Sequence, residues 1–122
     1  MPDKKRILLA EDNEDTRLIL RLIIESLGYE VTVAQDGREA VEMASSQLPD
    51  LVVMDILMPV MDGFEAIRRI REDPKIGSVP ILAATVLATP GDRAKCLASG
   101  LDEYLSKPFT RSELEAAIKK LI

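Results

Sequence analysis

The sequence predicts one α/β domain, doubly wound around a five-stranded parallel sheet with helices on both faces. Three observations predict this class. Short apolar runs recur along the 122 residues, stretches with apolar residues at helical spacing separate them, and capping residues, proline or glycine mark the junctions. Strands that alternate with helices in this way pair in parallel and are connected right-handedly.

Five runs have the composition of strands. Ile7–Ala10, Leu51–Met54 and Ile81–Ala84 are wholly apolar, which is typical of strands covered on both faces. Val31–Ala34 and Tyr104–Leu105 are more polar, so we expect them at the edges of the sheet.

A helix is expected after each strand, because apolar residues recur there on one helical face. The stripes are Leu20/Ile23/Ile24/Leu27, Ala40/Val41/Ala44, Phe64/Ile67/Ile70, Ala94/Leu97/Ala98/Leu101 and Leu114/Ala117/Ile118/Leu121. The spacing of a capping box, with Glu three residues after the cap, predicts helix starts at Asp36, Asp62 and Thr110. Thr89 before Pro90 predicts another, for a helix over 90–99. The glycines at expected helix ends are Gly28, Gly77 and Gly100.

The composition excludes several classes of function. Hydrophobic residues make up 47% and charged residues 30% of the chain, as in globular domains. A net charge of −5 argues against nucleic acid as a partner, because phosphate contacts need clustered Lys and Arg. No apolar run reaches membrane-spanning length. The single Cys96 suits a reducing, cytoplasmic compartment, and the absence of His removes the commonest general base and zinc ligand.

Polar residues follow four of the five predicted strands. Glu11 and Asp12 come after the first, Asp55 after the third, Thr85 after the fourth and Lys107 shortly after the fifth. In an open parallel sheet, ligands bind beyond the carboxyl ends of the strands. We therefore expect these side chains to share one rim and form a site.

Each acid also has a simpler explanation. Glu11 and Asp12 precede a helix, where acids favour the helix dipole, and Asp62 is an N-cap. Asp55 differs, because the residues at 56–59 are apolar and not helical in pattern, so it caps nothing. An acid that ends a buried strand without a local role indicates a functional residue.

Converging carboxylates require a counter-ion. Two unit charges about 4 Å apart repel by about 4 kcal/mol at an effective dielectric near 20. Oxygen ligands without His or a Cys pair favour a hard cation, and a site with few protein ligands suits Mg²⁺ better than Ca²⁺. Mg²⁺ and Lys107 together would neutralise three carboxylates and leave the site receptive to phosphoryl.

With these residues at its strand ends, the chain resembles the receiver domains of two-component response regulators. The elements that carry the resemblance are the acid pair Glu11-Asp12, the segment MDILMPVMDG at 54–63, Thr85, Tyr104 and Lys107-Pro108-Phe109. It extends over essentially the whole chain, so 1–122 is expected to be one receiver domain without an output domain. The resemblance implies a flavodoxin-like (βα)5 fold with strand order 2-1-3-4-5.

The resemblance also implies the chemistry of the site. Asp55 is expected to accept phosphoryl from the phosphohistidine of a histidine kinase or phosphotransfer protein, in a Mg²⁺-dependent reaction. Asp12, Asp55 and the backbone carbonyl of Leu57 are expected to bind the metal, with Glu11 acting mostly through water. The domain would catalyse only its own phosphorylation and dephosphorylation, and would not be an enzyme otherwise.

The switch residues follow from the same resemblance. Lys107, which is expected to precede a cis peptide bond to Pro108, would pair with a phosphoryl oxygen. Thr85 would hydrogen-bond another, and Tyr104 would then swing inward. We hypothesise that the bulky Leu57 and Leu87 shield the acyl phosphate from water and lengthen its life.

The way in which the domain would pass its signal on leaves two alternatives open. Because the chain ends with its fifth helix, we expect a stand-alone regulator of the chemotaxis or cell-cycle type; a domain excised from a longer regulator is the alternative. Downstream effector proteins would read the change through the 86–122 face. We expect a monomer, with a weak dimer as the alternative.

Three other functions are compatible with parts of this pattern. A flavodoxin-like redox protein has a similar layout, but the segment EDNED at 11–15 would repel a flavin phosphate. A haloacid-dehalogenase phosphohydrolase needs a second acid two residues after its nucleophile, where this chain has Leu57. A receiver fold that serves as an unphosphorylated interaction module is the third.

Overall fold

The protein is described from a computed structural model, which defines residues 4–56, 58, 60–86, 91, 94–95 and 98–122. Its elements are β1 (Arg6–Ala10), α1 (Glu14–Ser26), β2 (Glu30–Ala34), α2 (Gly37–Gln47), β3 (Leu51–Met54), α3 (Gly63–Glu72), β4 (Ile81–Thr85), β5 (Glu103–Ser106) and α5 (Arg111–Leu121). The strands form one parallel sheet in the order β2-β1-β3-β4-β5. The predicted class and strand order are both confirmed.

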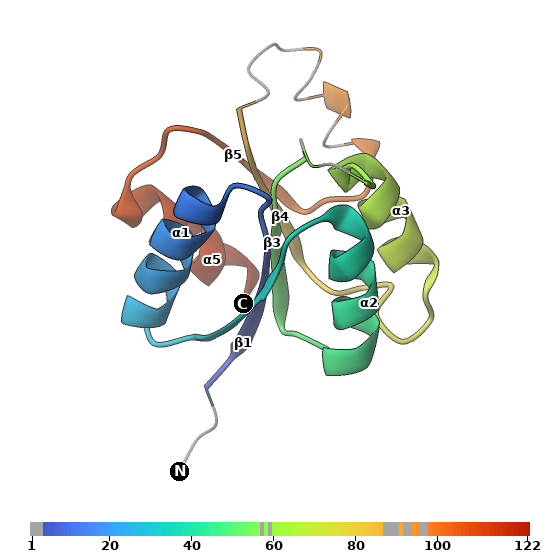
Figure 1. Ribbon diagram of the computed structural model, residues 1–122, viewed down its shortest axis with the longest axis horizontal. Coiled ribbons are helices and arrows are strands. Elements are labelled where there is room, and N and C mark those ends of the chain that lie inside the picture. The colour runs from blue at the N-terminus through green and yellow to red at the C-terminus, as the bar shows by residue number, and fades with distance from the viewer. Residues whose placement is uncertain (1–3, 57, 59, 87–90, 92–93, 96–97) are drawn as a thin grey trace.

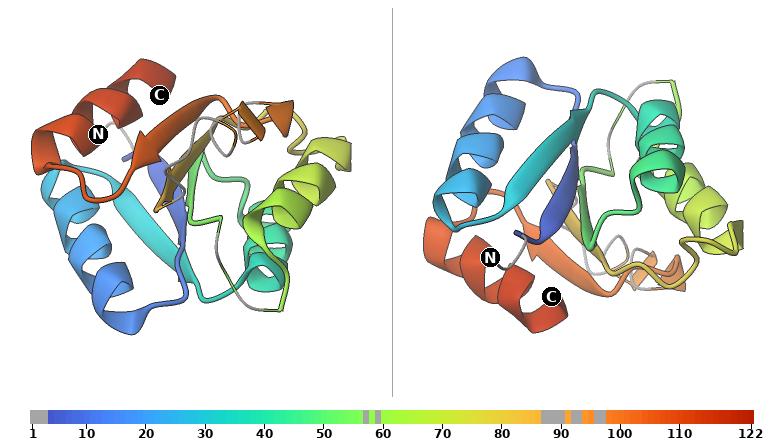
Figure 2. Two further views of the ribbon diagram at one scale, coloured as in Figure 1. Left: turned by 90° about the horizontal axis from the view of Figure 1, so that it is seen from above. Right: turned by 90° about the horizontal axis from the view of Figure 1, so that it is seen from below.

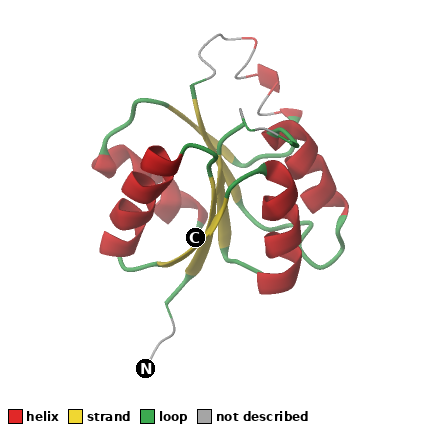
Figure 3. Ribbon diagram, viewed as in Figure 1, coloured by secondary structure: helices red, strands yellow, loops and turns green. Residues whose placement is uncertain are grey.

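The sheet is the middle of three layers (Figure 1). α1 and α5 cover one face, and α2 and α3 cover the other. The views from above and below show the same separation of the helices by the sheet (Figure 2). The loops that follow the carboxyl ends of the strands gather at one end of the molecule (Figure 3).

The core consists of two apolar clusters, one on each face of the sheet. Successive strand residues point to opposite faces, so Leu8 and Val52 pack in the cluster under α2 and α3, whereas Leu9 and Val53 pack in the cluster under α1 and α5. β1 is an interior strand, with Leu9 opposite both Val33 of β2 and Val53 of β3. Burial on both faces explains why the central strands are wholly apolar.

Helix starts are capped where the sequence predicts, but only one cap is reciprocal. The side chains of Asp36, Asp62 and Thr110 each accept a hydrogen bond from the backbone N–H three residues on. Only at Thr110 does the Glu side chain, Glu113, also accept from the backbone of the cap. The two aspartates therefore cap through one bond each and do not form the predicted boxes.

The predicted end of α3 is wrong. We expected the helix to stop near Gly77, but α3 ends at Glu72 and its C-cap, Asp73, is extended. Asp73 precedes Pro74, and the proline ring disfavours the helical conformation of the residue before it. Gly77 instead lies in the turn that leads to β4.

The predicted helix over 90–99 is described only in part. Gly91, Ala94, Lys95 and Ala98 are helical, whereas Thr89, Pro90 and Leu97 lie outside the described residues. After β5 the peptide bond between Lys107 and Pro108 is cis, as expected. Over the part of the chain that is described, no helix is long and apolar enough to cross a membrane.

Candidate functional site

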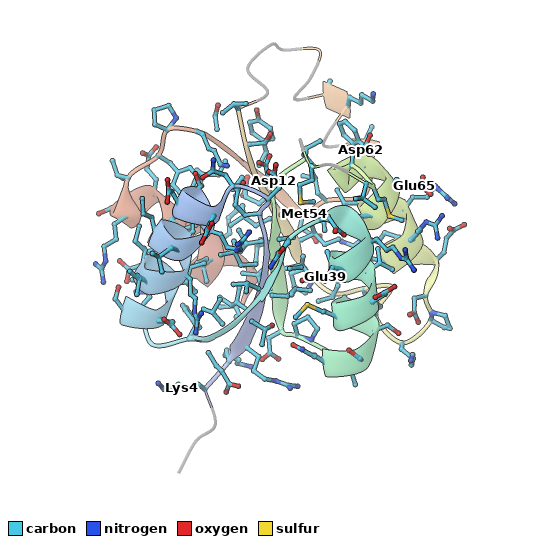
Figure 4. All side chains as sticks on the ribbon, in the orientation of Figure 1. Lys4, Asp12, Glu39, Met54, Asp62 and Glu65 are labelled. Atoms are coloured by element: carbon cyan, nitrogen blue, oxygen red, sulfur yellow. The ribbon has the colours of Figure 1, made fainter. Side chains whose placement is uncertain are left out.

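Three carboxylates converge where β1 and β3 end. These strands are neighbours with Ala10 opposite Met54, and the N–H of Asp55 donates to the carbonyl of Ala10 at 2.9 Å. Carboxylate oxygens of Glu11, Asp12 and Asp55 lie within 4.8 Å of one another. Figure 4 shows Asp12 at this end of the sheet, close to Met54, the last residue of β3. The expected meeting of the two strand ends is confirmed.

Lys107 brings a positive charge to the cluster from a distant part of the chain. Its Nζ lies 2.5 Å from Oε1 of Glu11 and 3.4 Å from Oδ2 of Asp55. The shorter contact is to Glu11, so in this structure the lysine is anchored mainly by the first acid. The sequence places Lys107 at the rim but does not distinguish these partners.

Glu11 is the most enclosed of the three acids, with 2% of its surface exposed. Burial raises the pKa of its carboxyl above the ordinary value, although the hydrogen bond from Lys107 opposes that shift. The second oxygen, Oε2, accepts from the backbone N–H of Asn13 at 3.1 Å. Both oxygens therefore have partners within the protein, which agrees with an indirect role for Glu11 at a metal.

The charge of the site fits a hard divalent cation. At 4.8 Å or less, two carboxylates repel by at least about 3.5 kcal/mol at an effective dielectric of 20. One lysine balances only one of three negative charges, and every candidate side-chain ligand is a carboxylate oxygen. Oxygen donors of this kind are the preferred ligands of Mg²⁺. Asp12, which is exposed, and Asp55 could bind the ion directly.

Thr85 lies beside this cluster at the end of β4, the strand next to β3. The residue is completely buried, and its Oγ1 has no hydrogen-bond partner among the described residues. A buried hydroxyl without a partner is costly. A ligand that placed an oxygen next to Thr85 would satisfy this group.

Tyr104 already has its hydroxyl inside the protein. The oxygen is buried and has no partner in the described ranges, and the ring packs against the cluster that contains Met54 and Ala83. The resemblance leads us to expect an inward swing of this ring on phosphorylation. The structure places the hydroxyl of Tyr104 in this inward position.

Three further residues that the sequence analysis discusses are Leu57, Leu87 and Asp62. Leu57, whose carbonyl is the expected third metal ligand, and Leu87 lie outside the described residues. Asp62 caps α3, where Figure 4 labels it together with Glu65, so its structural explanation is confirmed.

Two features next to the site were not predicted. Nη1 of Arg17 donates to the carbonyls of Glu11 at 3.0 Å and Asp12 at 3.4 Å. The only signal in the sequence is a basic residue five positions after Asp12, one turn into a helix with an acidic start. That signal is too weak to distinguish Arg17 from an ordinary solvated arginine.

The second feature is an apolar groove of about 390 Å³ between α1 and the segment after β5. Its lining residues are Thr16, Ile19, Leu20, Ile23, Val86, Lys107, Pro108 and Phe109. On the outer side of α1, Leu18, Ile19 and Leu22 are 54% to 57% exposed. The helical stripe that predicted α1 does not include these three residues. Lys107 belongs to both the groove and the acid cluster.

Comparison with known proteins identifies the family. Residues 7–119 match the response regulator receiver domain. An uncharacterized 14.6 kDa protein of Leptolyngbya boryana is 45% identical over 108 residues, which cover 88% of this chain and 82% of that protein. The response regulator MprA of Mycolicibacterium vanbaalenii is 40% identical over 117 residues, which cover 96% of this chain and 50% of that protein.

Solved structures agree with this result. The receiver domain of the sensor histidine kinase PA1611 from Pseudomonas aeruginosa, with a magnesium ion coordinated in the active-site cleft, has a TM-score of 0.91 and 41% identity, and 98% of each chain is covered. The chemotaxis protein CheY4 of Vibrio cholerae has a TM-score of 0.92 and 30% identity, covering 98% of this chain and 100% of that one.

The open parallel sheet and the acid cluster at the carboxyl ends of its strands define an α/β domain with a candidate site for a divalent cation. The chain belongs to the response regulator receiver domain family of two-component systems. It spans 44% to 50% of the length of several curated relatives, among them the ycf27 transcriptional regulators of Guillardia theta and Galdieria sulphuraria.

Proposed function

We propose that the chain is a phosphorylation-activated switch in which Asp55 is the phosphoacceptor. The observation that carries this proposal is the setting of Asp55 at the end of β3. It lies 3.4 Å from the Nζ of Lys107, within 4.8 Å of two further carboxylates, and beside the strand that ends in Thr85. The proposed donor is the phosphohistidine of a histidine kinase or phosphotransfer protein.

In the proposed reaction, an oxygen of Asp55 attacks phosphorus and forms the new P–O bond. The P–N bond to the donor imidazole breaks, and the imidazole keeps the electron pair. Bound Mg²⁺ would neutralise charge on the oxygens of the transferring group; Asp12, Asp55 and the carbonyl of Leu57 are its proposed ligands, with Glu11 behind them. Lys107 then pairs with one phosphoryl oxygen.

The proposed switch uses the two buried hydroxyls. The orphaned Oγ1 of Thr85 donates to a second phosphoryl oxygen, which satisfies a group that otherwise has no partner among the described residues. A shift of Thr85 toward the phosphoryl group would change the surroundings of Tyr104, whose ring packs against the cluster that contains Met54 and Ala83. Downstream proteins would read the change through the 86–122 face.

The apolar groove favours a protein over a small molecule as the phosphoryl donor. It adjoins the acceptor site through Lys107 and is lined mainly by apolar side chains. Two of its lining residues, Ile19 and Val86, are more than half exposed, and exposed apolar patches mark sites of protein association. A donor seated there holds its phosphohistidine next to Asp55.

Several properties of the whole protein are part of the proposal. We propose that 1–122 acts as a single receiver domain, catalyses only its own phosphorylation and dephosphorylation, and is monomeric. A histidine kinase uses ATP, so the cytoplasm is the proposed compartment. An unphosphorylated interaction module is the alternative function.

The test is incubation with acetyl phosphate and Mg²⁺, followed by intact-mass measurement. Wild type is expected to gain one phosphoryl group, Asp55→Asn none, and the control Asp15→Asn, an exposed acid in the first turn of α1, the same as wild type. Equal gain by Asp55→Asn would contradict the assignment of Asp55. No gain by wild type, also with a phosphohistidine donor, would favour the interaction module.

A further inference from the structure

We propose that Arg17 is a positioning residue for the metal site, because it fixes the backbone of Glu11 and Asp12 from α1. This inference rests on the proposed function, since it concerns the same Mg²⁺ site. Arg17 does not contact the reacting atoms. It acts through the peptide groups that carry two of the three carboxylates.

The contacts of Arg17 lie outside the helix ladder. The first carbonyl that α1 uses is that of Asn13, which accepts from the N–H of Arg17 at 2.8 Å. The carbonyls of Glu11 and Asp12 precede it and have no helical N–H within reach of the ladder. Nη1 of Arg17 donates to both, at 3.0 and 3.4 Å, so one guanidinium holds two consecutive peptide groups.

Asp12 depends on this support more than the other acids do. Glu11 is held by Lys107 and by the N–H of Asn13, and Asp55 is held by Lys107. The carboxylate of Asp12 is exposed and forms no hydrogen bond or ion pair with the described residues. Among the described residues, its position is therefore constrained only through its backbone, whose carbonyl is one of the two that Arg17 holds.

Electrostatics and positioning predict opposite effects of removing Arg17. A guanidinium near a cation site repels the ion, so the loss of its charge alone would tighten Mg²⁺ binding. If Arg17 fixes the backbone of Asp12, its loss lets the peptide groups that carry the carboxylates move, which weakens binding. The sign of the change therefore separates a positioning residue from a bystander charge.

The experiment is calorimetric titration of the whole chain with Mg²⁺ alone, on Arg17→Met, Arg17→Lys and Arg21→Met. Arg17→Met is expected to bind Mg²⁺ about 10-fold more weakly than wild type, the usual effect of removing a residue that orients a metal ligand. Arg17→Lys keeps the charge, but its ammonium lies one bond nearer the backbone than Nη1, so we expect it to hold the two carbonyls less well and its affinity to lie between the two. Arg21, one turn along α1, contacts Glu25, and its substitution is expected to leave the affinity unchanged.

A second measurement separates positioning from a general loss of structure. The rate of phosphorylation by acetyl phosphate is followed against Mg²⁺ concentration, after thermal unfolding in EDTA has identified the folded variants. Arg17→Met is expected to need about 10-fold more Mg²⁺ for half-maximal rate and to reach nearly the wild-type rate at saturation. A lower rate at saturation with unchanged Mg²⁺ dependence would overturn the inference.

Equal or tighter Mg²⁺ binding by Arg17→Met would also overturn it. If Arg17→Met does not fold, Arg17→Lys decides, because affinity equal to wild type together with an unchanged Mg²⁺ dependence would contradict the need for the two-carbonyl geometry. Failure of the proposed function has a different result. In that case wild type itself would neither bind Mg²⁺ nor gain phosphoryl.

Discussion

Replacement of Thr85 by Val is expected to stabilise the protein and to impair the switch. Thr85 is completely buried at the end of β4, and its hydroxyl has no hydrogen-bond partner in the described part of the chain. Valine has nearly the same shape and replaces the hydroxyl by a methyl group. The substitution therefore removes an unsatisfied polar group without creating a cavity.

The magnitude follows from the burial of the hydroxyl. A hydroxyl buried without a partner costs about 1–3 kcal/mol on scales derived from protein mutations. Burial of a methyl group in its place adds somewhat less than about 1 kcal/mol. Together these contributions amount to about 2–4 kcal/mol. Because neighbouring side chains also adjust, we expect about half of this gain, a rise of about 1–2 kcal/mol in the free energy of unfolding, or about 3–8 °C in Tm for a domain of this size.

The assay is urea unfolding of wild type, Thr85→Val and the control Thr32→Val. Thr32 is partly exposed in the edge strand β2, so its hydroxyl is hydrated and its substitution is expected to change stability by no more than about 0.5 kcal/mol. The effect of the substitution on the switch is measured with Mg²⁺ and beryllium fluoride, a phosphoryl mimic. This ligand is expected to raise the Tm of wild type more than that of Thr85→Val.

Two outcomes would contradict these expectations for Thr85. If Thr85→Val unfolds at lower urea than wild type, with an unchanged slope of the transition, the hydroxyl has a partner in the folded protein. An equal response of both proteins to beryllium fluoride would refute the role of Thr85 as a donor to phosphoryl.

Three further predictions concern residues around the site. Hydrogen bonds from Arg68 and Arg69 lower the pKa of Glu65 from 4.5 to about 2. The stabilising effect of the Glu65 carboxylate is therefore present above pH 4.5 and is lost as the pH falls through about 2. Glu65→Gln should remove this part of the acid dependence of urea unfolding, and 1 M salt should reduce the same acid dependence in wild type. Val60 is 78% exposed and has a φ of 68°, a conformation that β-branched residues rarely adopt. Val60→Asn is therefore expected to raise the free energy of unfolding by about 1 kcal/mol. A decrease in this free energy would show that the valine side chain has an unrecognised contact. A Cβ on Gly63 would lie 2.6 Å from Cα of Ile56 and 3.0 Å from the carbonyl oxygen of Asp55. Gly63→Ala should therefore lower the free energy of unfolding by at least about 2 kcal/mol and slow phosphorylation. Wild-type stability together with a wild-type rate of phosphorylation would mean that the loop before α3 adjusts freely.

The convergence of the acids is the part of the site that the sequence predicts best. Parallel strands carry their carboxyl ends to one edge, so residues that follow strands must meet there once the fold class is known. The position of Lys107 follows from the same rule. Its closer pairing with Glu11 than with Asp55 does not, because that choice depends on side-chain packing between residues 96 positions apart.

Errors in the prediction occur where neighbouring residues compete locally. Gly77 is a plausible helix end, but Pro74 acts first and α3 stops at Glu72. Asp36 and Asp62 have the spacing of capping boxes, yet their Glu partners do not return the bond to the backbone of the cap. The side chain of Glu65 instead binds Arg69, and that of Glu39 the N–H of Gln35.

The sequence by itself determines the fold class, the strand order that its family implies, and the chemical identity of the groups at the rim, because period and polarity are local properties of the chain. Only the tertiary structure reveals that Thr85 and Tyr104 bury hydroxyls without partners among the described residues, that Val60 has a left-handed backbone, and that Arg17 holds two carbonyls. These features depend on the packing of segments against one another, and on side-chain directions that no periodic pattern encodes.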